Sequence, residues 1–219
     1  ETLLVKHARH RVPQLAATLG LANLVVLASL IGYAILHRKP LWAMFRSEYS
    51  LATWFSSVQL VLLALVAYTI YNVLVLSRQQ QESPVRHRWA WAVVALGFVV
   101  LALDERFGIP EALRDYLFGP AGLWADSAWF IPGDAGLYLF FIIGLLFSPF
   151  LLGERRQARK ALPMFVLALL LTFIVLLIDS LNDSTMYTWP AWRFWDYTFE
   201  EMGEIWAELL FLLAFLRVL

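Results

Sequence analysis

The last apolar stretch of the chain, "FEEMGEIWAELLFLLAFL" (residues 199–216), decides how the protein must be built. With its flanks it is long enough to cross a membrane, yet it carries four acids: Glu200, Glu201, Glu204 and Glu208. At 100° per residue, these positions fall within about 100° of one another around a helix. A carboxylate at the centre of a bilayer costs roughly 2.5–3.5 kcal/mol even on lenient insertion scales. The stripe therefore has to face the interior of a helical bundle.

The composition is that of a membrane protein. Of the 219 residues, 61% are apolar and 16% are charged, whereas soluble domains are about half apolar and a quarter charged. The absence of cysteine excludes disulfides and thiolate metal sites. The formal net charge is zero, which gives no indication of nucleic-acid binding. We expect the lipid bilayer as a partner, together with other membrane proteins in a larger complex, and no nucleic acid.

A membrane span needs about 20 predominantly apolar residues, and six windows of the sequence meet this requirement. They are residues 15–36, 51–77, 88–106, 130–152, 161–181 and 197–217. The sequence therefore predicts an all-α fold, a polytopic bundle of six transmembrane helices that forms a single domain over residues 1–219. In the loop "GIPEALRDYL" (108–117), apolar residues at helical spacing predict a short interfacial helix on the outer surface.

The basic residues predict the orientation. Eleven of the seventeen lie on the side of the two termini and six lie on the other side. Because basic residues favour the cytoplasmic side, both termini are expected in the cytoplasm, and we place the chain in a bacterial inner (cytoplasmic) membrane. Thirteen of the seventeen acids then fall on or just below the outer face.

Acids of three spans meet at this outer level. The third span ends in Asp104 and Glu105, and the fifth ends in Asp179 and Asp183. At these helix C-termini the helix dipole disfavours an acid by about 0.3–1 kcal/mol. Arg106, Arg193, shared protons or a bound cation should compensate. The candidate site comprises Asp104, Glu105, Asp179, Asp183, Glu200, Glu201, Glu204 and Glu208.

The residue types in this cluster limit what it can bind. None of the four histidines belongs to it, so a metal would be held by oxygen alone. Oxygen ligands suit Ca2+, Mg2+ or Mn2+ and argue against zinc, copper or a carboxylate–histidine di-iron site. Four other polar residues of the predicted spans are expected to form hydrogen bonds between helices. They are Asn23, Gln59, Asn72 and Thr172.

Three segments resemble a known group of proteins. "LDERFGIPE" (103–111) is similar to the Leu-Asp-Glu…Ile-His-Glu signature of an uncharacterised group of multi-pass bacterial and archaeal membrane proteins. "WFIPG" and "FEEMGEIWAELLFLLAFL" resemble later segments of that group. The signature histidine is replaced by Pro110 here, so chemistry that depends on an imidazole is not expected. The resemblance implies a site at these acids and no particular reaction.

The sequence leaves three functions open. The first is an accessory or structural membrane subunit whose outward-facing carboxylate cluster binds a cation or internal arginines. The second is a cation or proton transporter, although the glutamate stripe continues inward only as Ala207, Phe211 and Phe215. The third is a metal-dependent, lipid-modifying membrane enzyme, for which no nucleophile motif or phosphate-binding loop is present. We expect the first and assign no catalytic residue.

The orientation can be tested by labelling. Cysteines introduced at Gln80 and Ser127 should react with a membrane-impermeant reagent from opposite sides, because an odd number of spans separates these two positions. Ser127 should be labelled in intact cells and Gln80 only after permeabilisation. Labelling of Gln80 in intact cells would reverse the predicted orientation.

Overall fold

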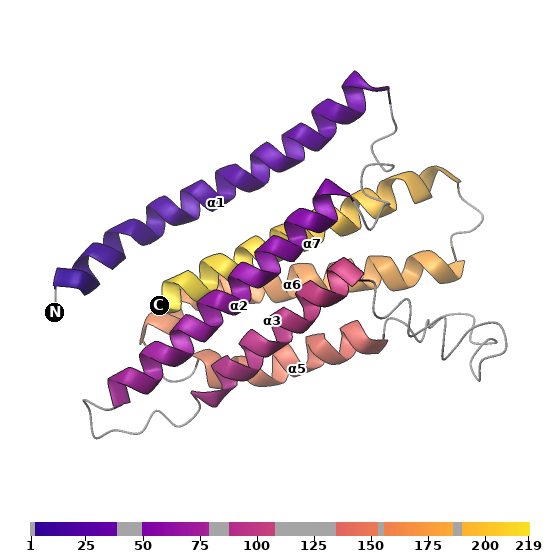
Figure 1. Ribbon diagram of the computed structural model, residues 1–219. Helices are drawn as coiled ribbons and strands as arrows, with labels where there is room; N and C mark the ends of the chain where they lie inside the picture. Colours follow the sequence, from indigo (N-terminus) through magenta and orange to yellow (C-terminus); the bar gives the residue numbers. More distant parts are fainter. Residues whose placement is uncertain (1–2, 39–49, 79–87, 108–134, 153–155, 186–189) are drawn as a thin grey trace.

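The chain folds into long helices that run along one another (Figure 1). A computed structural model describes residues 3–38, 50–78, 88–107, 135–152, 156–185 and 190–219. Within these ranges there are six helices and no strand. The helices are α1 (Leu3–Leu36), α2 (Leu51–Arg78), α3 (Trp89–Phe107), α5 (Ala135–Leu152), α6 (Arg156–Thr185) and α7 (Pro190–Val218). The prediction of an all-α fold is confirmed for this part of the chain. The predicted interfacial helix at 108–117 lies outside it.

The prediction of six membrane spans is confirmed only in part. By length and composition, three helices in the described ranges are long and apolar enough to cross a membrane, through Ala17–Leu36 of α1, Leu51–Leu76 of α2 and Lys160–Ile178 of α6. The acids near the end of α3 and along α7 interrupt their apolar runs. Helix α5 is 18 residues long, which is near the short end of the range for a span. The three apolar helices point to association with a membrane.

The ends of α1 and α2 follow from local chemistry. Ser50 caps α2, because its hydroxyl oxygen accepts a hydrogen bond from the Thr53 backbone N–H at 3.0 Å. Helix α1 ends before Arg38, whose φ of 51° is in the left-handed region that helix C-caps adopt. These signals explain why the predicted start of the second span and end of the first agree with the structure. By contrast, α1 begins at Leu3 rather than residue 15, and α6 and α7 begin earlier than predicted.

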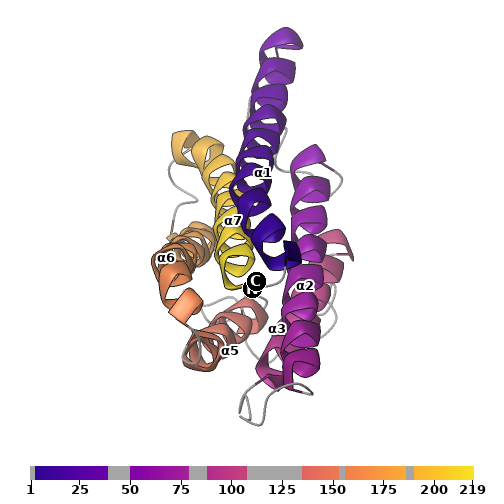
Figure 2. The same cartoon turned by 90° about the vertical axis from the view of Figure 1, so that its left-hand side faces the viewer.

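Helix α7 lies at the centre of the bundle. It packs against α6 along much of its length and against α2 and α1 (Figures 1 and 2). Helix α2 also packs extensively on α3, and α5 covers α6 and α3. Large apolar side chains remain on the outer faces, such as Leu24 (53% exposed), Leu65 (56%) and Leu167 (53%). Such faces suit contact with hydrocarbon, because few monomeric soluble proteins expose so much apolar surface.

The core around the C-terminal half of α7 is aromatic. Phe215 is 2% exposed and packs edge-on against Trp91 of α3 at a ring-centroid distance of 5.1 Å. Phe211 meets Phe98 of α3 at 6.1 Å and Phe165 of α6 at 5.5 Å. These spacings lie within the favourable range for aromatic pairs. The aromatic cluster (Trp91, Phe98, Phe165, Phe211 and Phe215) therefore ties α3 and α6 to α7.

Helices α6 and α7 approach closely at Gly203. A Cβ atom built on this glycine would overlap Cγ2 of Val175 on α6. Gly203 lies between Glu201 and Glu204 in the sequence. Close packing against α6 at this position therefore sets where the two glutamates stand in the bundle.

We predict that Gly203→Ala destabilises the protein by about 1–3 kcal/mol, because overpacking outweighs the gain in helix propensity. Thermal unfolding of the purified protein in detergent measures the change. Gly97→Ala in α3 is the matched control, since no atom lies within 4 Å of its added Cβ, and it should be neutral or stabilising. Val175→Ala should restore stability to Gly203→Ala. Equal stability of the two glycine variants would contradict the close crossing.

Candidate cation site

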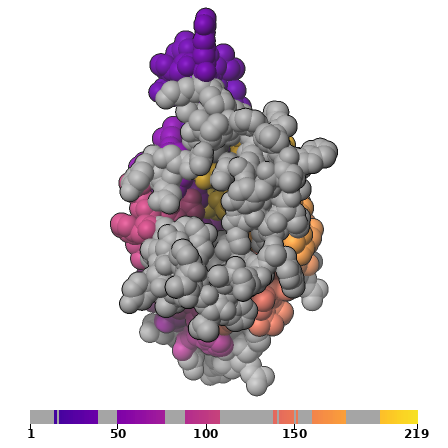
Figure 3. All heavy atoms as spheres, turned by 90° about the vertical axis from the view of Figure 1, so that its right-hand side faces the viewer, coloured from indigo at the N-terminus to yellow at the C-terminus, as the bar shows by residue number. Residues whose placement is uncertain are grey.

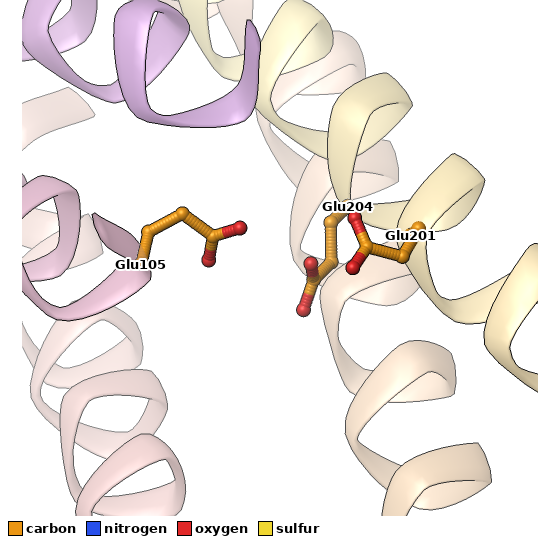
Figure 4. A group of neighbouring side chains, drawn as sticks. All are labelled: Glu105, Glu201 and Glu204. Carbon is orange, nitrogen blue, oxygen red and sulfur yellow. The ribbon is translucent and has the colours of Figure 1, made fainter. Parts of the chain in front are cut away.

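Three glutamates from two helices converge at one end of the bundle. Glu105 comes from the last turn of α3, and Glu201 and Glu204 come from α7. One carboxylate oxygen from each lies within 4.8 Å of the other two. Figure 4 shows the Glu105 side chain extending from α3 toward the pair on α7. We refer to Glu105, Glu201 and Glu204 as the glutamate trio.

The positions of the trio follow from the sequence and the packing. Glu201 and Glu204 are three residues apart, so they are neighbours on one face of α7. Helix α2 packs against both α3 and α7, which holds the end of α3 beside this face. Seen from this end of the bundle, part of α7 lies between α3 and α6 (Figure 3). The trio is thus assembled by the tertiary arrangement of helices that are far apart in the sequence.

Electrostatic repulsion makes this arrangement unfavourable without a counter-charge. Each member of the trio is partly buried. For two ionised carboxylates at a separation of 4.8 Å, the repulsion is on the order of 3 kcal/mol at an effective dielectric constant of about 20. Three such pairs have to be offset by protons or by positive charge. The trio therefore has the charge and the ligand atoms that a hard cation requires.

Glu208 lies one helical turn further along α7 and is the most buried of these acids, at 7% exposure. The hydroxyl of Ser56 on α2 donates a hydrogen bond to its Oε1 atom at 2.6 Å. The other oxygen, Oε2, is buried and has no hydrogen-bond partner. The prediction that the glutamate stripe turns away from lipid is confirmed at this position.

The structure brings together part of the predicted constellation. Asp104 and Glu200 are partly buried on α3 and α7, next in sequence to Glu105 and Glu201. Asp179 and Asp183 lie on α6, but their side chains are outside the described residues, as is that of Arg193. Arg106 is described and exposed. That Asp179 and Asp183 belong to the cation site therefore stays a prediction.

Sequence reasoning did not assign a partner to Glu208. Ser56, fully buried, belongs to a polar face of α2 with Thr53 and Gln59, at a spacing of three residues. That spacing is the signal from which the partner could have been found. A serine hydroxyl in a helix more often bonds to its own backbone, as Ser57 does to the Thr53 carbonyl oxygen at 3.0 Å. The sequence therefore does not distinguish these two serines.

The predictions for the other polar residues had mixed outcomes. Asn23 of α1 and Gln59 of α2 both donate from their amide nitrogens to the Ile205 carbonyl oxygen of α7, at 3.4 and 3.5 Å. Both are hydrogen bonds between helices, as predicted. The prediction for Thr172 is wrong, because its hydroxyl donates to the Ala168 carbonyl oxygen within α6. A threonine can satisfy its hydroxyl on its own helix without a partner helix.

The fold and the site together define a helical, membrane-associated protein with a carboxylate cluster between its helices. The sequence model of one family, described as a domain of unknown function (DUF8692), matches residues 14–219. The chain therefore belongs to this family. No curated protein and no solved structure matches the chain.

Proposed function

We propose that the protein is an integral membrane subunit in which the glutamate trio binds one hard divalent cation and thereby joins α3 to α7. In this role it is an accessory or structural protein. The single observation that carries the proposal is the convergence of Glu105, Glu201 and Glu204, one oxygen from each within 4.8 Å.

The spacing of the trio suits a hard cation. Calcium binds oxygens at 2.3–2.6 Å, so two ligands on opposite sides of the ion are about 4.6–5.2 Å apart. The trio's oxygens are at most 4.8 Å apart, so they are close enough to bind one calcium ion together, and a smaller ion such as Mg2+ or Mn2+ would need at most a modest contraction. Carboxylate oxygens without imidazole or thiolate favour these metals over zinc or copper. Ca2+, Mg2+ and Mn2+ are therefore the cations to test.

The helix packing suggests what the cation would do. The aromatic cluster joins α3 to α7 through Phe98 and Trp91 in one half of the bundle. At the other end, Glu105 reaches α7 with a negatively charged side chain, and the partners there are negative too. A bound cation would convert this repulsive contact into an attractive one. This supports a structural role in which the ion closes one end of the α3–α7 pair.

We further propose that α3, α5 and α7 cross the membrane with the three apolar helices. By composition alone, its acids exclude α7 from the membrane spans. The acid nearest the middle of the helix, Glu208, is buried in the bundle, so it does not meet hydrocarbon. From the distribution of basic residues described above, we propose that both termini lie in the cytoplasm of a bacterial cell and that the trio lies toward the outer face. Other membrane proteins are then the expected partners. The resemblance to the Leu-Asp-Glu…Ile-His-Glu group stays a prediction.

The cation proposal predicts metal-dependent stability. At a hundredfold excess over its dissociation constant, a ligand stabilises the native state by about 2.7 kcal/mol. For a chain of this size that corresponds to a rise in Tm of roughly 5–10 °C. Calcium, magnesium or manganese should therefore raise the Tm of EDTA-treated wild-type protein, and Glu201→Gln should remove most of the gain.

Glu200→Gln is the matched control for this experiment. It removes the same charge from the adjacent position but leaves the trio intact, so the metal response should persist. If no divalent cation raises the Tm of the wild type, or if both glutamine variants respond alike, the trio does not bind the ion and the proposal is wrong.

A structural role also predicts that the protein conducts nothing. One and two turns beyond Glu208, Phe211 and Phe215 pack among aromatic rings of α3 and α6. This layer offers no polar group to a proton or a hydrated ion. Liposomes containing the protein should show the same proton and cation flux as empty liposomes. Flux that is lost in Glu208→Gln would favour the transporter instead.

A further inference from the structure

A second group of polar side chains surrounds α7 at the level of Ile205 and Glu208. It draws on three helices: Asn23 from α1, Ser56 and Gln59 from α2, and Glu208 from α7. Their exposures are 1%, 0%, 3% and 7%. A polar group buried to this degree is costly unless it is satisfied. The group therefore calls for an explanation beyond helix packing.

The orientation of the two amides follows from their shared acceptor. The Ile205 carbonyl oxygen can only accept hydrogen bonds, so Asn23 and Gln59 must both turn their NH2 groups toward it. Their amide oxygens then face away from that carbonyl. Ser56 uses its hydroxyl hydrogen on Glu208 Oε1, at 2.6 Å. The Ser56 oxygen keeps lone pairs with which it can bind a cation.

Glu208 supplies the unsatisfied charge. Its Oε2 atom is buried without a hydrogen-bond partner, on a side chain that is only 7% exposed. A buried carboxylate oxygen without a hydrogen-bond partner lowers the stability of the fold, because it has lost its water and gained nothing in return, whereas an exposed oxygen keeps its water. The carboxylates of Glu105 and Glu201 add negative charge to its surroundings. Every one of these features attracts a positive ligand to Oε2.

We propose that Glu208 and Ser56 form a second cation site, which binds one monovalent metal ion such as Na+. A single carboxylate is neutralised by one positive charge, whereas a divalent ion would leave a net charge in the interior of the bundle. A proton on Oε2 would itself be a donor in need of an acceptor, whereas a metal ion at Oε2 could also be bound by the lone pairs of the neighbouring Ser56 oxygen. The site differs from the glutamate trio in its ligands, although Glu105 and Glu201 of the trio add negative charge to its surroundings.

The test compares sodium with choline at constant ionic strength. Purified full-length protein in detergent is kept in EDTA, so that the trio does not contribute, and choline chloride is replaced stepwise by sodium chloride. The Tm of the wild type should rise with sodium and reach a plateau. Glu208→Gln and Ser56→Ala should lose the response. Ser57→Ala is the matched control, because that hydroxyl bonds to its own helix, and it should respond like the wild type.

Direct binding keeps the proposal testable if Glu208→Gln does not fold. Equilibrium dialysis with radioactive sodium should give one bound ion per wild-type chain. Ser56→Ala should bind at least about tenfold more weakly, as expected for the loss of one contact to a charged group. A wild type whose Tm and sodium content are the same in sodium and in choline overturns the proposal and indicates that Glu208 carries a proton instead. A sodium response that survives in Glu208→Gln overturns it as well.

Discussion

A carboxylate cannot face hydrocarbon without a large cost, and in our proposal, in which α7 crosses the membrane, the arrangement of this bundle depends on that constraint. Helix α7 carries four acids along one narrow stripe. The cost of exposing even one of them to lipid is a few kcal/mol, which is a large share of the net stability of an ordinary domain. Glu208 is accordingly buried and the other three acids are partly buried, and α7 occupies the centre, with α6, α2 and α1 packed around it. The helices α6, α2 and α1 cover α7 and so keep its acids away from hydrocarbon.

The two halves of α7 are held to their neighbours by different forces. Toward the C-terminus, Phe211 and Phe215 pack into rings of α3 and α6, a contact that needs no ion and gains from close packing. Toward the N-terminus, carboxylates of α3 and α7 lie close together, so protons or positive charge have to offset their repulsion. In our proposal, a bound cation supplies that positive charge at this end of the helix pair. This contrast makes a cation a structural element in our proposal.

Depth along α7 also separates two chemical environments. The trio brings several negative charges together where the side chains are partly buried, which suits a divalent ion. Glu208 lies a turn deeper, bonded to Ser56 and almost completely enclosed, so it can balance only one positive charge. Between them, Asn23 and Gln59 converge on the Ile205 carbonyl and bring α1 and α2 to the same level. In our proposals, this gradient of burial along α7 selects a divalent ion at the trio and a monovalent ion at Glu208.

The sequence by itself determined the helical class, most helix ends and the inward direction of the glutamate stripe. These are properties of single segments: the length of an apolar run, the Ser50 cap, and the period that places Glu200, Glu204 and Glu208 on one face. The sequence predicted six spans, whereas length and composition support three in the described residues. Whether the charged residues of α3 and α7 allow these helices to cross a membrane depends on which side chains surround those residues.

Only the tertiary structure decided which acids meet. Glu105 joins Glu201 and Glu204 because α2 packs on both α3 and α7, and Ser56 rather than Ser57 reaches Glu208 because of the rotation of α2 about its axis. The close crossing at Gly203 likewise depends on Val175 of another helix. Such contacts join residues about 30 to 150 positions apart, and their geometry depends on how whole helices rotate and cross, which no local pattern encodes.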